Sequence, residues 1–378
     1  MSAPRSTGTL PDTPGGYGPA WGGPALGPSP PPPPRPAARL VTAFANPAQA
    51  ALTILLAALL AWAGWSVWGW AVTHAVWHAD AAACDALGGQ GACWGVVPEK
   101  LRAMLFGRYP PAQQWRAGAA TAVLLALVGL SAWPRCWRAA LLVPLWLLGL
   151  LLALALLGGG VAGLPAVPTR DWGGLPLTLL LTIAGLIAAF PLAVLLALAR
   201  RSPWPAARTL SRLYVELVRG VPLISVLFMA SFLLPLLLPA RWQADVLLRV
   251  FIALALFVAA YLSEVIRGGL QAVPQGQLAA ARALGLSHWQ QQRLVVLPQA
   301  LRAVLPSIVN VAIGVLKDTS LVTVVSLYDL TGALQLALGG DPVWRPYYLE
   351  GYLFVALLYW AMCFGLSRYG RWMERHWR

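Results

Sequence analysis

Residues 278–298 read "LAAARALGLSHWQQQRLVVLP" and form a polar interruption in a chain that is otherwise strongly apolar. The alanine-rich run from residue 277 to residue 284 favours a helix, since alanine has the highest helix propensity. Gly285 follows this run directly and is the residue type preferred just past a helix end. The first half of the stretch therefore predicts a short helix that ends in a glycine turn.

A second short helix is expected after the turn. Ser287 can cap its N-terminus, and Gln290, three residues later, can complete a capping box. Pro298 follows Leu297 and is expected to stop this helix, because the residue before a proline disfavours helical geometry. Helices this short are not stable alone in water. We therefore predict a docking element that is held in place by its surroundings or by a partner.

The composition places the rest of the chain in a membrane. Of the 378 residues, 59% are hydrophobic and 11% are charged, whereas soluble domains carry roughly 25% charged residues. The formal net charge is +14, but the basic residues lie in the gaps between apolar runs. This distribution is typical of the positive-inside rule and argues against nucleic acid as a partner.

Eight stretches are apolar and long enough to span a bilayer, for which roughly 20 residues are needed. They cover about residues 51–72, 117–134, 139–163, 176–199, 222–240, 246–267, 306–327 and 348–367. The proline- and glycine-rich residues 1–45 cannot bury a core and are expected to form a disordered tail. The predicted fold class is an all-α integral membrane protein with about eight transmembrane helices.

Arginine is concentrated on one side of this eight-helix arrangement. The connections 200–221 and 267–302 and the tail 368–378 carry many arginines and few acidic residues. Because basic residues mark the cytoplasmic side, both termini and the docking element are expected in the cytoplasm. The loop 73–116 then lies on the outer side.

The docking element resembles the cytoplasmic EAA signature of permease subunits of bacterial ABC importers. In that signature Glu-Ala-Ala is followed by three residues, Gly, nine residues, an aliphatic residue, any residue and Leu-Pro. The matching positions are Ala279, Ala280, Ala281, Gly285, Val295, Leu297 and Pro298. Ala279 replaces the signature glutamate, so an ion pair from that position to an ATPase is missing. An exposed ion pair contributes only about 0–1 kcal/mol, so we expect coupling through packing to survive.

Four further stretches resemble the polar amino-acid branch of these permeases. They are "YVELVRGVPL" at 214–223, "YLSEVIRGGLQAVPQGQ" at 261–277, "LPQALRAVLPSIVN" at 297–310 and "LKDTSLV" at 316–322. The resemblance covers about residues 175–367. The N-terminal extension, with "CWGVVPEKLRAMLFGRYPPAQQWR" at 93–116, is similar to M-type permeases of general L-amino-acid importers, which pair with a second permease.

The resemblance implies a type I ABC importer permease core of five helices, preceded by three N-terminal helices. The expected domains are a cytoplasmic tail (1–45), an extension with three transmembrane helices (46–173) and its periplasmic loop (73–116), a permease domain (174–367) with a cytoplasmic coupling loop (268–305), and a basic cytoplasmic tail (368–378). The residues expected to couple to the ATPase are Ala280, Ala281, Gly285, Ser287, Val295, Leu297 and Pro298. The implied function is ATP-driven translocation of L-amino acids across a bacterial inner membrane.

The implied partners are an ABC ATPase dimer, a second homologous permease, a periplasmic amino-acid-binding protein and membrane lipid. The chain has no Walker A pattern, since neither Lys100 nor Lys317 is preceded by Gly and followed by Ser or Thr. ATP and Mg are therefore expected on the ATPase, and no cofactor is expected on this chain. It is interpreted as a transport subunit rather than an enzyme.

A few ionisable residues fall within or beside the apolar spans. Lys317 and Asp318 lie near the middle of the seventh span, where an ionised group costs about 2.5–3.5 kcal/mol. With Thr319 they either line the translocation path or form a compensating pair that only orients helices. Glu264 and Arg267 lie one helical turn apart at the end of the sixth span. A surface ion pair is the favoured interpretation there, and a place for Glu264 on the translocation path is the alternative.

The cysteines form no CxxC motif and the histidines are few, so no metal site is expected. Cys84 and Cys93 share one loop. They either form a disulfide, if that loop faces an oxidising space, or remain two free thiols.

Two other functions stay open. A secondary transporter would normally carry several ionisable residues at the membrane midplane, and this chain has few besides Lys317 and Asp318. An intramembrane enzyme would need a catalytic constellation, and the chain has neither an HExxH nor a GxSxG motif.

Overall fold

The computed structural model describes residues 46–161, 163–239 and 244–376, so the predicted tail 1–45 lies outside the described residues. The chain divides into two compact units, Met1–Trp68 and Gly69–Arg378. The described part of the first unit is essentially one helix, α2 (Pro47–Trp68). It carries no charged side chain and its leucines and tryptophans are exposed, as expected of a helix that faces lipid.

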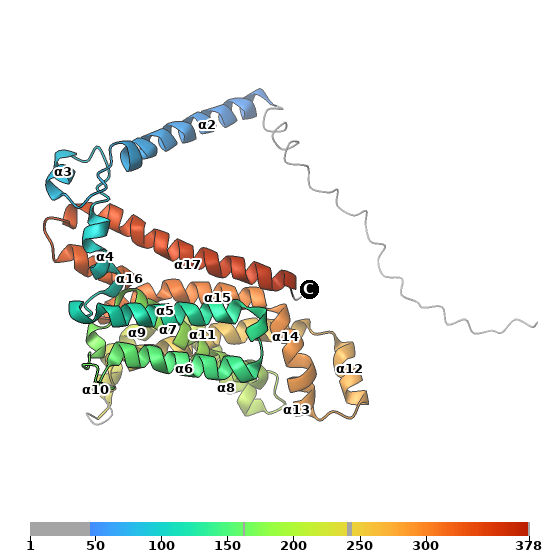
Figure 1. Cartoon of the computed structure of the whole chain (residues 1–378). Coiled ribbons are helices and arrows are strands. Elements are labelled where there is room, and N and C mark those ends of the chain that lie inside the picture. The colour runs from blue at the N-terminus through green and yellow to red at the C-terminus, as the bar shows by residue number, and fades with distance from the viewer. Residues whose placement is uncertain (1–45, 162, 240–243, 377–378) are drawn as a thin grey trace, which may run out of the picture. The chain divides into compact units, whose positions relative to one another are not determined.

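The second unit begins with short elements and two long helices. They are η1 (Gly69–Thr73), α3 (Ala81–Ala86), α4 (Val96–Phe106), η2 (Pro111–Gln113), α5 (Gln114–Ala132), η3 (Pro134–Cys136), α6 (Ala139–Gly158) and η4 (Thr169–Asp171). The long helices α5 and α6 pack against each other and run side by side (Figure 1).

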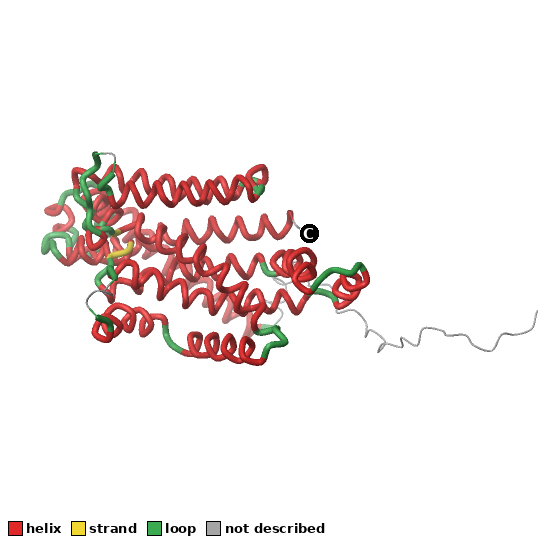
Figure 2. The backbone as a smooth tube through the Cα atoms, turned by 90° about the horizontal axis from the view of Figure 1, so that it is seen from below, coloured by secondary structure: helices red, strands yellow, loops and turns green. Residues whose placement is uncertain are grey.

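The remaining elements form the larger part of this unit. They are α7 (Gly174–Ala199), α8 (Pro205–Gly220), α9 (Leu223–Phe228), η5 (Met229–Leu233), α10 (Leu234–Leu237), α11 (Val246–Ala272), α12 (Gln275–Ala283), α13 (His288–Gln290), η7 (Gln291–Val296), α14 (Leu297–Ala303), α15 (Leu305–Asp318), η8 (Thr319–Val325), β1 (Tyr328–Asp329), α16 (Leu330–Gly339), η9 (Arg345–Tyr347) and α17 (Tyr348–His376). The axes of the long helices are roughly aligned, and the tube view shows these helices as a bundle (Figure 2).

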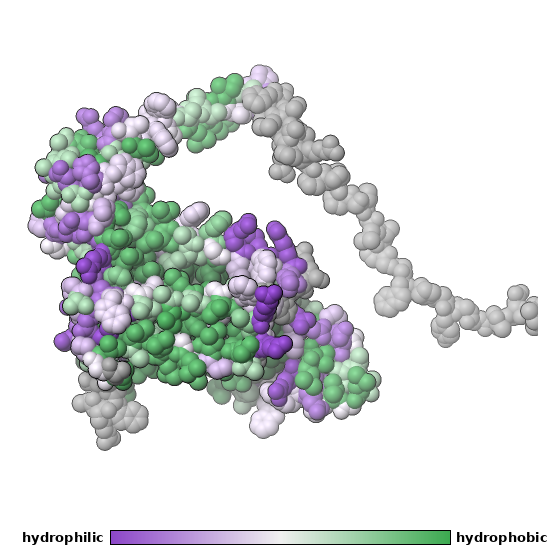
Figure 3. Space-filling model, viewed as in Figure 1, coloured by the Kyte–Doolittle hydropathy of each residue, from purple (hydrophilic) through white to green (hydrophobic). Residues whose placement is uncertain are grey.

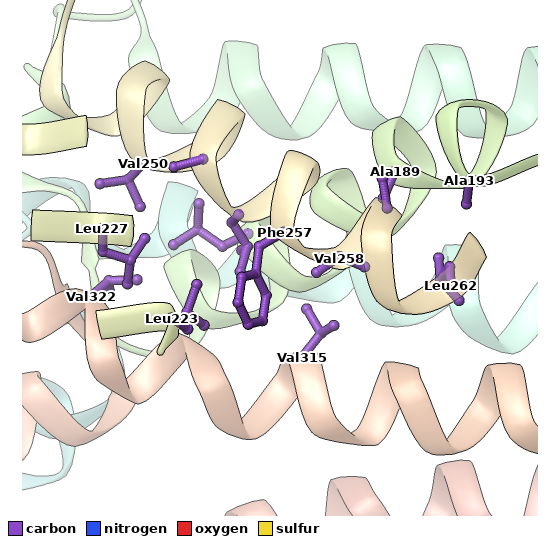
Figure 4. Close-up of a cluster of buried hydrophobic side chains, with 14 of the residues drawn as sticks. Ala189, Ala193, Leu223, Leu227, Val250, Phe257, Val258, Leu262, Val315 and Val322 are labelled. Carbon is purple, nitrogen blue, oxygen red and sulfur yellow. The ribbon is translucent and has the colours of Figure 1, made fainter. Parts of the chain in front are cut away.

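The centre of the bundle is the contact between α7 and α11. Ala189, Ala193 and Ala197 are fully buried and repeat every four residues, so they share one face of α7. Small residues let helices approach closely in a membrane. Larger side chains of α11, among them Val258 and Leu262, belong to the same buried cluster (Figure 4).

The helices α5 and α6 join α7 through a second buried cluster. Ala117, Ala120, Leu124 and Leu127 recur at helical spacing on α5 and are all buried. A Cβ at Gly149 of α6 would lie 2.6 Å from the methyl carbons of Leu127, so the Leu127 side chain packs directly on this glycine. Two helices of the predicted N-terminal extension therefore share a core with the predicted permease domain.

The predicted fold class is confirmed. Among the described residues, seven helices are long and apolar enough to span a membrane, or up to eight if one bent pair counts as a span. In the second unit apolar residues form a broad band along the bundle and polar residues gather at its ends (Figure 3). This is the distribution that a bilayer imposes.

The predicted span 222–240 differs from the structure. It corresponds to α9, η5 and α10, and this run meets the preceding helix α8 at 103°. The bend lies at Val221, whose backbone is extended, next to Pro222, which disfavours helical geometry at the residue before it. The expected loop 200–221 contains α8, a helix whose exposed Leu210, Leu213 and Leu217 recur at helical spacing.

Candidate functional site

The docking element lies at one end of the bundle, where α12 and α13 project, and α3, α4 and α16 lie toward the other end (Figure 1). α12 ends as the sequence predicts. Gly285 has φ +72°, the left-handed conformation that glycine adopts without strain. Its amide donates to the Arg282 carbonyl, and the Leu286 amide donates to the Ala281 carbonyl. These two bonds form a Schellman motif, which satisfies carbonyls at the end of the helix.

The second short helix begins with the predicted capping box. The Gln290 amide donates to Ser287 Oγ at 3.4 Å, and the Ser287 amide donates to Gln290 Oε1 at 2.8 Å. The Gln291 side chain adds a bond to the Leu286 carbonyl at 2.7 Å, which ties the turn to η7. The geometry of the turn is therefore held by local hydrogen bonds.

The predicted stop at Pro298 is wrong. The helix continues from α13 through the π-helical segment η7 into α14 and ends at Ala303. Proline lacks an amide hydrogen, and in an α-helix its ring clashes with the carbonyl four residues back. The wider π turn before Leu297 removes that clash, so Pro298 lies in the first turn of α14, where proline is tolerated.

The docking element has a buried side and an exposed side. Ala281 is buried, and α12 packs against η7. Ala280 and Pro298 are exposed, whereas Val295 and Leu297 are half-buried. The predicted coupling residues thus divide between the inner packing of the element and its surface.

Three large apolar side chains on the exposed side were not singled out from the sequence. Leu284, Trp289 and Leu294 are exposed by 79%, 62% and 61%. The signal available in the sequence was their position on short polar helices, where apolar side chains have little to pack against. We add these three side chains to the candidate docking surface, since they lie on its exposed helices.

The helix α14 connects the docking element to the centre of the bundle. It packs against α11, and Ala300 and Val296 are buried at that contact. An ideal Cβ at Gly269 of α11 would lie 2.5 Å from the Ala300 carbonyl oxygen and 2.8 Å from Val304 Cγ1. The backbones of α11 and α14 therefore lie in direct contact at this point, with no side chain between them.

Glu264 lies at the centre of a cluster of arginines near the end of α11. The predicted ion pair with Arg267 is present, with Arg267 Nε 2.8 Å from Glu264 Oε1. Arg200, at the end of α7, also reaches Oε1 at 2.5 Å, and Arg219 of α8 lies 3.9 Å from Oε2. One carboxylate thus joins three helices. A role for Glu264 on the translocation path stays a prediction.

Lys317 and Asp318 lie at the end of α15, where the helix changes into the 3₁₀ segment η8. Lys317 is exposed and Asp318 is half-buried, while Thr319 is buried and donates to the Leu316 carbonyl. A 3₁₀ segment within a span often marks a hinge. The change in helix type adds a structural reason to keep the prediction that these residues line the path.

A buried carboxylate, Asp329, was missed in the sequence and lies just before α16. Its Oδ1 accepts from the Gly332 amide at 2.9 Å, and its Oδ2 accepts from Tyr359 Oη at 2.6 Å. The next amide, that of Leu330, donates to Thr178 Oγ1 at 2.9 Å. Burial raises the pKa of the Asp329 carboxyl above its ordinary value. Asp329 caps α16 and links it to α17, and the Leu330 amide links α16 to α7. An Asp before an apolar run was the available signal.

The loop 73–116 folds against α16 and α17. Cys84 and Cys93 are joined by a disulfide with their Cα atoms 5.5 Å apart. The Cys93 amide donates to the buried Glu350 carboxylate at 2.8 Å. Lys100 Nζ lies 2.5 Å from Asp341 Oδ2, and this bond holds the pKa of the Asp341 carboxyl below its ordinary value. These contacts make the segment a folded cap.

Among the residues that the structure describes, no three His, Cys, Asp or Glu side chains come together as a metal site. The buried carboxylates of Glu350 and Asp329 accept hydrogen bonds instead, from the Cys93 amide and from Tyr359 Oη respectively.

Residues 189–378, half of the chain, match the family model described as "Binding-protein-dependent transport system inner membrane component". The chain belongs to this family. The permease is also 41% identical to the inner membrane amino-acid ABC transporter permease protein YhdY of Escherichia coli (strain K12), over 82% of this chain and 86% of that protein.

A second relative has similar coverage. The glutamate/glutamine/aspartate/asparagine transport system permease protein BztC of Rhodobacter capsulatus is 36% identical over 88% of this chain and 91% of that protein. A chain from the crystal structure of an amino acid ABC transporter with histidines is 30% identical and covers 53% of the permease and 90% of that chain, with a TM-score of 0.47.

Family membership settles the class of the protein. The permease is a multi-pass transport component of an inner membrane, and it is not an enzyme. The prediction of an ABC permease is confirmed, and the alternatives of a secondary transporter and an intramembrane enzyme are set aside. A binding protein and an ABC ATPase are the partners that membership implies.

Proposed function

We propose that the permease forms the translocation path of an ATP-driven importer of L-amino acids. The observation that carries this proposal is the docking element of residues 275–296, with its Schellman turn, its capping box and its exposed apolar side chains. The names of the two long relatives, which concern amino acids in one case and glutamate, glutamine, aspartate and asparagine in the other, support the substrate class.

The ATPase subunits carry ATP and Mg in this proposal, and the permease itself binds no cofactor. A second homologous permease completes the path, as the resemblance of the N-terminal extension to M-type permeases implies. A periplasmic amino-acid-binding protein delivers the substrate at the end of the bundle that carries the cap of residues 73–116. Uptake of labelled amino acids by the reconstituted complex, with each of the others as competitor, tests the substrate class.

Movement passes from the ATPase into the bundle by direct contact. Closure of the ATPase dimer displaces α12 and α13, and the continuous run from α13 to α14 carries this displacement to α11. The backbone contact of Gly269 with Ala300 leaves little slack between α14 and α11. The Glu264 cluster then connects α11 with α7 and α8, so that the helices around the path respond together.

Truncation of Trp289 to alanine is expected to weaken ATPase docking by roughly thirtyfold, since removing a tryptophan anchor from an interface costs about 2 kcal/mol or more. Trp289 is 62% exposed, so it adds little to the packing of the free permease. The affinity of the purified permease for its ATPase provides the measurement.

Trp204→Ala provides the matched control for this variant. Trp204 is also exposed, by 75%, and lies in a connection on the same predicted side but outside the docking element. The proposed docking surface would be wrong if Trp289→Ala bound the ATPase as tightly as the unaltered permease does. It would also be wrong if Trp204→Ala lost as much ATPase affinity as Trp289→Ala.

Both termini lie in the cytoplasm in this proposal, and the cap of residues 73–116 lies in the periplasm. We expect a membrane-impermeant maleimide to label Cys84 and Cys93 in intact cells only after reduction of their disulfide. Cys136, in the connection between α5 and α6, serves as the internal comparison. It should react only in inverted vesicles. Labelling of Cys136 in intact cells, with labelling of Cys84 and Cys93 only in inverted vesicles, would show that the topology is the opposite of the proposed one.

A further inference from the structure

Three arginines and two aromatic rings form a pocket at the C-terminal end of α17. The cavity measures about 410 Å³ and is lined by Ala132, Arg368, Tyr369, Arg371, Trp372 and Arg375. Arginines at spacings of three and four residues share one face of a helix. The ion pairs among residues 46–376, so far as the structure describes them, all involve other side chains. Arg368, Arg371 and Arg375 thus take part in none of the described ion pairs, and the pocket carries a net positive charge.

The pocket lies beside a cluster of three aromatic side chains. Trp372 lies 5.9 Å from the ring of Tyr369 and 5.9 Å from that of Trp137, which follows α5. Tyr369 Oη and Trp137 Nε1 both donate to the Ser131 carbonyl, at 3.4 and 2.9 Å. Tryptophan and tyrosine favour the boundary between the apolar membrane and water. The rings thus fix the end of α17 against the end of α5 at that depth.

An apolar cavity adjoins the arginine pocket. It measures about 490 Å³, lies between α5, α7, α15 and α17, and shares Ala132 and Tyr369 with the pocket. Its lining is apolar apart from Thr182, the Trp146 indole N–H and the Tyr369 hydroxyl. Gly129 and Gly365 both line this cavity, and a Cβ added at either would meet no atom within 4 Å. The arginine pocket, which we place at the membrane surface, is thus continuous with an apolar groove between the helices.

We propose that the two cavities together hold one anionic phospholipid, with its phosphate on Arg368, Arg371 and Arg375 and an acyl chain in the adjoining groove. Arginine matches the geometry of phosphate oxygens through parallel hydrogen bonds. Basic pockets between transmembrane helices on the cytoplasmic side suit anionic headgroups. A free phosphate ion would use only the pocket, and an acidic protein segment would leave the apolar groove unfilled. Only a lipid joins both chemistries in one molecule.

The first test measures lipid retention by the full-length permease. The protein is reconstituted with phosphatidylglycerol or phosphatidylcholine, extracted in mild detergent and examined by native mass spectrometry. We expect one tightly held phosphatidylglycerol and no comparable retention of phosphatidylcholine. Arg371→Gln with Arg375→Gln should weaken retention by roughly thirtyfold, because each arginine near an anionic headgroup contributes about fivefold.

A charge-matched variant controls for general attraction to anionic lipid. Arg208→Gln with Arg212→Gln removes the same charge from α8, where both arginines are exposed and neither lines the pocket. This variant should retain phosphatidylglycerol like the unaltered permease. Equal loss in the two double variants, or equal retention of the two lipids, would overturn the proposal.

The groove is tested separately by filling it. Gly129→Leu and Gly365→Leu place a side chain in the open space and, being helical positions, favour the helix. Each should release the lipid without lowering the unfolding temperature, whereas excess inorganic phosphate should release none. Retention unchanged by both leucines, or displacement by phosphate alone, would exclude a lipid. Lost ATPase binding with unchanged lipid would identify the pocket as a protein contact instead.

Discussion

Gly285→Val is expected to abolish ATP-driven uptake while leaving the permease in the membrane. Gly285 has φ +72°, which costs a residue with a side chain about 1–2 kcal/mol, and a β-branched residue suffers most. The Schellman bonds from Gly285 and Leu286 depend on that conformation. Without them α12 and α13 lose their relative orientation, and the ATPase meets a misplaced surface. Uptake by proteoliposomes that contain the full complex is the measurement.

Gly276→Val separates this effect from simple bulk in the docking element. Gly276 lies in α12, has no positive φ, and a Cβ there would meet nothing within 4 Å, as is also true at Gly285. The two variants therefore differ in backbone strain and share open surroundings. Transport at an unaltered rate in Gly285→Val would show that the turn does not couple the ATPase to the path.

Gly269→Leu is expected to uncouple ATP hydrolysis from transport and to lower the stability of the permease. The new side chain would begin 2.5 Å from the Ala300 carbonyl oxygen, so α11 and α14 would have to separate. Overpacking of this kind costs about 1–3 kcal/mol. The ATPase rate should then lose its dependence on the binding protein, because displacement of α14 no longer reaches α11. Unfolding temperature and stimulated ATPase rate are the two readouts.

Gly268→Leu is the matched control, one residue away on the same helix. A Cβ at Gly268 meets nothing within 4 Å, so the same substitution adds a side chain of the same size without pushing α11 away from α14. We expect a permease that transports and unfolds like the unaltered one. If the two leucine variants behaved alike, the contact between α11 and α14 would not carry the movement.

Local chemistry explains which predictions succeeded. The Gly285 turn and the box of Ser287 with Gln290 depend on residues at most a few positions apart, and the structure has both. The prediction for Pro298 failed because the rule for prolines assumes an α-helix, and the π-helical η7 changes the register before it. The proline rule used on the sequence does not report this change of helix type.

The sequence by itself determined the membrane environment, the long helices and the docking element, because apolar length, capping residues and turn residues act over short distances. Only the tertiary structure decided which distant groups meet. It brought Arg200 to Glu264 across 64 positions, Tyr359 to the buried Asp329, and the arginines of α17 to the apolar groove beside α5. These contacts follow from the packing of whole helices, since the energy of each one depends on where the others lie.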